Sequence, residues 1–70
     1  MLAVASLPRL PRLRVIRVEK ALSQQELAKS AGVSRVTIVR LERGDVDARY
    51  ATVRKVAAAL GVQPGELMAR

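Results

Sequence analysis

The stretch "LSQQELAKSAGVSRVTIVRLERG", residues 22–44, carries two helix-start signals only eleven residues apart. Ser23 can cap a helix, and Glu26 three residues later completes the capping-box pattern. Gly32 can take the left-handed conformation that ends this helix, and Ser34 can cap a second helix directly after it. Because so few residues separate the two helices, they cannot lie antiparallel, and we expect them to cross at a wide angle.

Signals for the start and end of a helix recur elsewhere in the chain. Pro11 suits the first position of a helix, Gly61 can end another, and Pro64 can open a last one. No segment shows the alternation of a strand, so the sequence predicts an all-α fold with five short helices over residues 11–70. Residues 1–10 hold no periodicity and read as a flexible N-terminal arm. Periodicity alone leaves open an ordinary helical bundle in which the central turn has no special role.

Composition excludes several kinds of chemistry. The 70 residues include no cysteine and no histidine, which excludes disulfides, Cys/His zinc sites, thiol nucleophiles and imidazole bases. Asp45 and Asp47 are the only close acid pair, and turn chemistry explains them without a metal. We therefore expect no enzyme, no metal and no cofactor.

Charge points to a polyanionic partner. Thirteen Lys and Arg residues against six acids give a net charge of +7, which favours nucleic acid, an anionic surface or an acidic protein. The apolar run at the N-terminus is cut off by Pro8, too early for a signal or membrane segment, so a cytoplasmic protein is expected.

The second predicted helix of the central pair has two unlike sides. At about 100° per residue, Ile38 and Leu41 share one side. The opposite side collects Arg35, Val36, Val39, Arg40 and Arg43. Arginine offers a fork to guanine, and an apolar side chain can pack on a thymine methyl, so this side suits a major groove. In the alternative interpretation the two valines are half-buried and the arginines only confer solubility. A membrane-surface helix would need a larger, continuous apolar stripe.

The central stretch, followed by "VRKVAAALGV" and "PGELM", resembles the phage-repressor-like helix-turn-helix family (Cro/repressor, or xenobiotic-response-element type). The similarity runs from Leu13 to Met68, and Ala28 and Gly32 match the small residues of the helix crossing and the turn. The resemblance implies a five-helix, lambda-repressor-like DNA-binding domain with a central helix-turn-helix. Its recognition helix would span Ser34 to Arg43.

The resemblance also implies roles for single residues. The residues that would contact base edges are Arg35, Val36 and Arg40. Further contacts to the DNA, including those to its backbone, are implied for Gln24, Ser34, Thr37, Val39, Arg43, Arg49 and Tyr50. Gln24 matches a phosphate-clamping glutamine, and Tyr50 matches a position that is usually Leu or Phe in the core. Arg17 and Glu42 match a buried structural ion pair.

Three positions depart from the family pattern. Ala21 stands where a glycine often ends the first helix, which costs about 1 kcal/mol if the turn needs a positive φ. Arg49 replaces a usual serine cap of the fourth helix, so Asp47 is expected to cap it instead. Gln63 is a poor cap before Pro64.

The sequence thus predicts a sequence-specific regulator of transcription that binds double-stranded DNA, a repressor that occupies its operator as a two-fold homodimer. Leu60, Val62 and Met68 would form the pairing surface, or else belong to the monomer core. One alternative is the antitoxin of a toxin–antitoxin pair, whose arm, residues 2–10, grips a partner protein. Another is a module that binds an acidic protein and never DNA.

Overall fold

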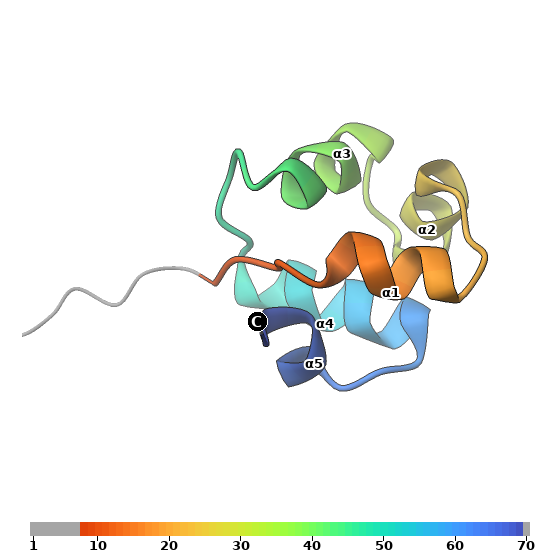
Figure 1. Cartoon of the computed structure of the whole chain (residues 1–70). Coiled ribbons are helices and arrows are strands. Elements are labelled where there is room, and N and C mark those ends of the chain that lie inside the picture. Colours follow the sequence, from red (N-terminus) through yellow and green to blue (C-terminus); the bar gives the residue numbers. More distant parts are fainter. Residues whose placement is uncertain (1–7, 70) are drawn as a thin grey trace, which may run out of the picture.

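The computed structural model describes residues 8–69, and over that range it contains five helices and no strand. The helices are α1 (Leu13–Glu19), α2 (Gln24–Ala31), α3 (Arg35–Arg43), α4 (Tyr50–Leu60) and α5 (Pro64–Met68). Figure 1 shows α2 and α3 on one side of α1, α5 on the other, and α4 behind. The expected all-α architecture is confirmed.

The core is built from small aliphatic side chains that every helix contributes. The largest side chains that are fully buried are Leu13, Leu27, Ile38, Val53, Val56 and Leu67. α2 packs against both α3 and α4, while α1 contacts α3 and α5. Because none of these side chains is aromatic, the short helices can approach closely.

The two central helices begin as the sequence predicts. The Ser23 hydroxyl accepts from the backbone N–H of Glu26 at 3.0 Å, and the Glu26 carboxylate accepts from the N–H of Ser23 at 2.8 Å. The Ser34 hydroxyl accepts from the N–H of Thr37 at 3.1 Å. These side chains satisfy N–H groups that a helix start leaves without intrahelical partners.

Left-handed residues end four of the helices. Gly32, Gly44 and Gly61 have φ values of 73°, 74° and 70°, as expected for glycines at helix ends. Ala21, after α1, has a φ of 58°. The turn therefore does need a positive φ at this alanine, and the expected strain of about 1 kcal/mol applies.

Residues 8–10, which the sequence assigns to the flexible arm, are tied to the domain instead. The Leu10 side chain is only 3% exposed and belongs to the core. The Pro8 carbonyl accepts from the N–H of Ala48 at 2.8 Å, which ties this segment to the loop before α4. Burial of Leu10 explains the difference, because an isolated leucine between two prolines gives no periodic signal. The rest of the expected arm, residues 1–7, lies outside the described residues.

The start of α4 differs from the prediction in two ways. Arg49 is the N-cap and forms no side-chain cap. Asp47 does not cap the helix, since its carboxylate pairs with the Arg9 guanidinium at 2.9 Å. Tyr50 is 56% exposed, so its expected place in the core is wrong. It stands at the first position of α4 and projects outward, while Val53, one turn later, fills the core.

The residues considered for pairing of two copies divide between core and surface. Leu60 is 4% exposed and belongs to the core, and Val62 packs partly against it. Met68 on α5 is 36% exposed. At the start of α5 the Glu66 carboxylate accepts from the N–H of Gln63 at 2.8 Å. None of the helices described is long and apolar enough to cross a membrane.

Candidate nucleic-acid interface

α3 is anchored to the core on one side and free on the other. Ile38 and Leu41 are 0% and 4% exposed, which fixes the helix on the domain. On the opposite side the exposed residues are Arg35, Val36, Arg40 and Arg43, with Val39 partly buried. Val36 is 56% exposed, so it is not covered by a neighbouring helix. The expected free face is present, and it combines cationic forks with an apolar surface.

The start of α3 presents two hydroxyl groups. Ser34 caps the helix, and its Oγ lies 2.9 Å from the Oγ1 of Thr37 in a further hydrogen bond. Ser34 is exposed and Thr37 partly buried. Because both hydroxyls are held in place by the cap, the first turn of α3 is a rigid platform for Arg35 and Val36.

A buried ion pair fastens α1 to α3. Arg17 donates from Nε and Nη2 to the two carboxylate oxygens of Glu42, at 2.5 and 3.1 Å. The side chains are only 11% and 4% exposed. The hydrogen bonds to Glu42 raise the pKa of Arg17, although burial opposes the shift. Arg17 also donates from Nη1 to the Leu22 carbonyl at 2.6 Å. The expected structural pair is present and holds the turn before α2 as well.

Gln24 completes a junction of three helices. Its Nε2 donates to Oε1 of Glu42 at 3.0 Å, so one carboxylate connects α1, α2 and α3. Sequence reasoning missed this link, because residues 18 positions apart give no local signal. Since an amide nitrogen carries two hydrogens, the second remains available for a phosphate. The role of Gln24 as a phosphate clamp stays a prediction.

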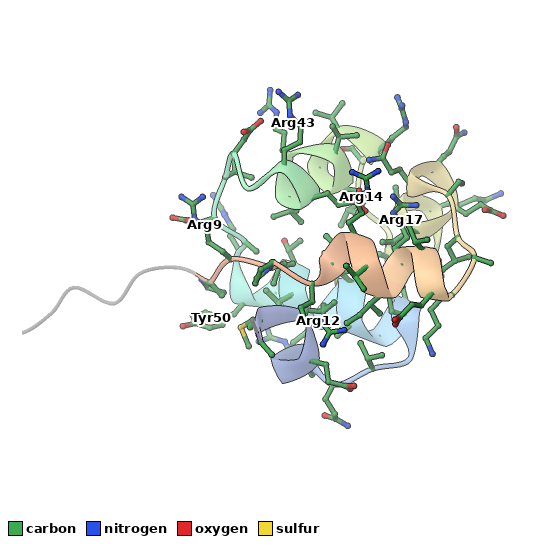
Figure 2. All side chains as sticks on the ribbon, viewed as in Figure 1. Arg9, Arg12, Arg14, Arg17, Arg43 and Tyr50 are labelled. Carbon is green, nitrogen blue, oxygen red and sulfur yellow. The ribbon has the colours of Figure 1, made fainter. Side chains whose placement is uncertain are left out.

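Further cationic residues surround the loop after α3. Arg43 pairs with Asp45 at 3.3 Å, and both side chains are at least half exposed. Arg9 donates to the carbonyl of Gly44 and pairs with Asp47. Figure 2 shows Arg9 and Tyr50 at the same end of the domain. Arg49 is exposed there too, and its contact with DNA, like that of Tyr50, stays a prediction.

The described residues hold no group of three or more His, Cys, Asp or Glu side chains placed to bind a metal ion. The arrangement that does stand out is a rigid helix, supported on one side and presenting arginine and valine on the other. An all-helical domain in which α2 and α3 are joined by a tight turn, with α3 exposed in this way, is a helix-turn-helix domain.

A family model described as Helix-turn-helix matches residues 13–67. The chain belongs to the Cro/C1-type helix-turn-helix family, as its sequence resemblance implied. The cryptic phage CTXphi transcriptional repressor RstR of Vibrio cholerae is 37% identical over 57 residues, which cover 81% of this chain and 51% of RstR. The chain spans about half the length of the first curated relatives it matches.

Solved structures agree with this assignment. The restriction-modification controller protein C.AhdI from Aeromonas hydrophila superposes with a TM-score of 0.78 at 39% identity, over 80% of this chain and 85% of that chain. The biofilm regulator SinR, known from Bacillus subtilis, was solved in complex with DNA. That structure superposes with a TM-score of 0.79 at 32% identity, over 83% of this chain and 94% of that chain.

Proposed function

We propose that this protein is a sequence-specific regulator of transcription, a repressor that occupies double-stranded operator DNA with α3 in the major groove. The observation that carries the proposal is the free face of α3. Arg35, Val36 and Arg40 stand exposed on a helix whose other side is locked into the core. A recognition helix needs this combination, because side chains that read bases must be held at a fixed angle.

The proposed roles follow from side-chain chemistry. Arg35 and Arg40 offer guanidinium forks to guanine O6 and N7, and Val36 offers methyl groups to a thymine methyl. Contacts to phosphates orient the domain without reading sequence. We assign them to Gln24, Ser34, Thr37 and Arg43 beside this face and to Arg49 and Tyr50 at the start of α4, with Val39 as a further contact. The net charge of +7 adds a salt-dependent attraction to any duplex.

We also infer that two copies bind one operator. Helix-turn-helix proteins use half-sites about 34–36 Å apart, so a two-fold site implies a two-fold dimer. The exposed Met68 on α5 supports a pairing surface at that end of the domain. Acting on DNA would place the protein in the cytoplasm and requires no catalytic step.

Selection from a randomised duplex library tests the proposal, followed by titration of the selected site and a scrambled duplex over a range of salt. A palindromic site bound at least ~10³ times more tightly than scrambled DNA is the expected result. Weak binding that is equal for all sequences and abolished by modest salt would contradict it. The basic face would then belong to an acidic protein partner, to be sought by co-purification.

Arg40→Ala tests the base contact directly. The variant should lose about 1–3 kcal/mol of binding free energy on the selected site and little on scrambled DNA. Arg40→Lys is the matched control, because it keeps the charge but loses the fork. Both variants should therefore lose discrimination, and neither should lower the salt slope, which reports phosphate contacts. Equal losses on both duplexes would remove Arg40 from base readout.

A further inference from the structure

A groove runs beside the recognition helix, between α1, the start of α2 and α3. It encloses about 530 Å³ and is bounded by Arg14 on α1, by Gln24 on α2, and by Val39 and Arg43 on α3. The Arg17–Glu42 pair also lines it. Figure 2 shows Arg14 on the side of α1 that faces α3. The groove therefore shares one wall, Val39 and Arg43, with the face of α3 that is proposed to read DNA.

The charges that line this groove are unbalanced. The carboxylate that lines the groove belongs to Glu42. This group is nearly buried and already bonded to Arg17. Arg14 is exposed and forms no ion pair with any residue from 8 to 69. Arg43 has only the exposed Asp45 as partner, at 3.3 Å. An anion entering the groove would meet two cations and no free carboxylate.

The dimensions of a DNA duplex indicate which anion would enter the groove. A major groove is about 12 Å wide, and an α-helix with its side chains has a diameter of about 10–12 Å. When α3 fills the major groove, the sugar-phosphate strand that borders it must pass directly beside the helix. On the side of Val39 and Arg43, the space beside α3 is the groove that Arg14 borders.

We propose that Arg14 binds a backbone phosphate of the operator in this groove, opposite the free amide hydrogen of Gln24. This inference rests on the proposed function, since it assumes that α3 lies in the major groove. Arg14 would position the domain on the duplex and would carry no sequence preference. The ion pair beneath would keep the groove open by holding α1 at a fixed distance from α3.

The test compares Arg14→Gln with a matched variant, Arg12→Gln. Arg12 is next to α1 but projects to its other side, toward α5 (Figure 2). The affinities of the wild type and both variants for the selected site and a scrambled duplex are measured by fluorescence anisotropy over a range of salt. Arg14→Gln should weaken binding to both duplexes by about tenfold and lower the slope of log K against log salt by about 0.9. Arg12→Gln should change the affinity less than about twofold and leave the slope unchanged.

Other outcomes separate this inference from the proposed function. If the wild type selects a site but Arg14→Gln behaves like Arg12→Gln, only the inference about Arg14 is overturned. A loss confined to the selected site would make Arg14 a base contact instead. If the wild type selects no site, the proposed function fails and the inference with it. Arg14→Lys should restore the salt slope, since lysine also binds phosphate, and unchanged thermal unfolding of each variant shows that the fold is intact.

Discussion

The turns before and after α2 use the same three-residue pattern with one difference. Ala21-Leu22-Ser23 and Gly32-Val33-Ser34 each place a left-handed residue first, a partly buried aliphatic residue second and a serine cap third. Only the first residue differs in its cost, because alanine is strained at positive φ and glycine is not. The aliphatic residue and the cap therefore specify the conformation, and the glycine only lowers its conformational strain.

The turn before α2 has one tie to a distant residue that the turn after α2 lacks. The carbonyl of Leu22 accepts from the buried Arg17 guanidinium, which Glu42 in turn fixes. The turn at Gly32 is closed locally, by hydrogen bonds from the N–H groups of Gly32 and Val33 to the last turn of α2. The N–H groups of Ala21 and Leu22 likewise donate to the last turn of α1, to the carbonyls of Val18 and Arg17. Both turns are thus closed locally, and only the strained one is also tied to a distant ion pair. The variants below change one of these two turns, the ion pair or a helix cap.

The largest effect should come from Glu42→Ala. Removing the carboxylate leaves the nearly buried Arg17 without its partner and should lower the free energy of unfolding by about 3 kcal/mol. Urea denaturation followed by circular dichroism measures this loss. Asp45→Ala is the control, because it breaks the exposed pair with Arg43 and should cost about 0.5 kcal/mol or less. Similar costs for the two variants would show that the buried pair does not hold α1 in place.

Exchanging the residue types at the two turns should give smaller changes of opposite sign. Relief of left-handed strain stabilises the fold by about 1–2 kcal/mol. The extra freedom of glycine in the unfolded chain reduces this gain by about 0.4–1 kcal/mol. Ala21→Gly should therefore stabilise the domain by about 0.5–1 kcal/mol, and Gly32→Ala should destabilise it by about the same amount. A methyl group at Gly32 meets no atom within 4 Å, so strain alone decides that cost.

Thermal unfolding of both single variants and the double variant measures these changes. Because the two turns are held independently, the effects should add within about 0.5 kcal/mol. A loss of stability in Ala21→Gly would mean that the pattern of cap and aliphatic residue does not set the turn.

Local signals made much of the fold predictable. The helix starts at Ser23 and Ser34, the glycine ends and the two sides of α3 follow from short-range patterns, which tertiary contacts here reinforce. The Arg17–Glu42 pair came only from the family resemblance, since 25 residues separate its members.

What the sequence did not predict depends on contacts between distant segments. Leu10 enters the core from a stretch without periodicity, and Asp47 is drawn from a capping role by Arg9. Tyr50 stands at the first position of α4 and is exposed, while Val53 one turn later is buried. The groove at Arg14 is likewise invisible until α1 and α3 are placed side by side. Pairings of this kind depend on packing geometry, which one chain's pattern does not encode locally.

The smallest effect should be a dependence on pH at the start of α2, which the start of α3 lacks. The backbone N–H of Ser23, and then its side chain, lower the pKa of Glu26 from its ordinary value of 4.5. A carboxyl whose pKa is lower in the folded chain contributes stability above its unfolded value, and this contribution is lost as the pH falls through the folded value. Glu26→Gln cannot titrate, so its thermal midpoint should lie below that of the wild type at neutral pH and converge with it in acid.

Ser23→Ala sharpens this test, because it removes the hydroxyl but keeps the backbone N–H that Glu26 binds at 2.8 Å. The variant should therefore retain part of the wild type's acid dependence while losing about 1 kcal/mol of capping at every pH. Ser34→Ala should lose a similar amount with no change in acid dependence, since Thr37 rather than an acid stands third in α3. If Glu26→Gln left the acid limb unchanged, the pH dependence would have to come from other carboxylates. If instead Ser34→Ala altered it, the two helix starts would be coupled, and α2 and α3 would not be independently capped halves of the helix-turn-helix.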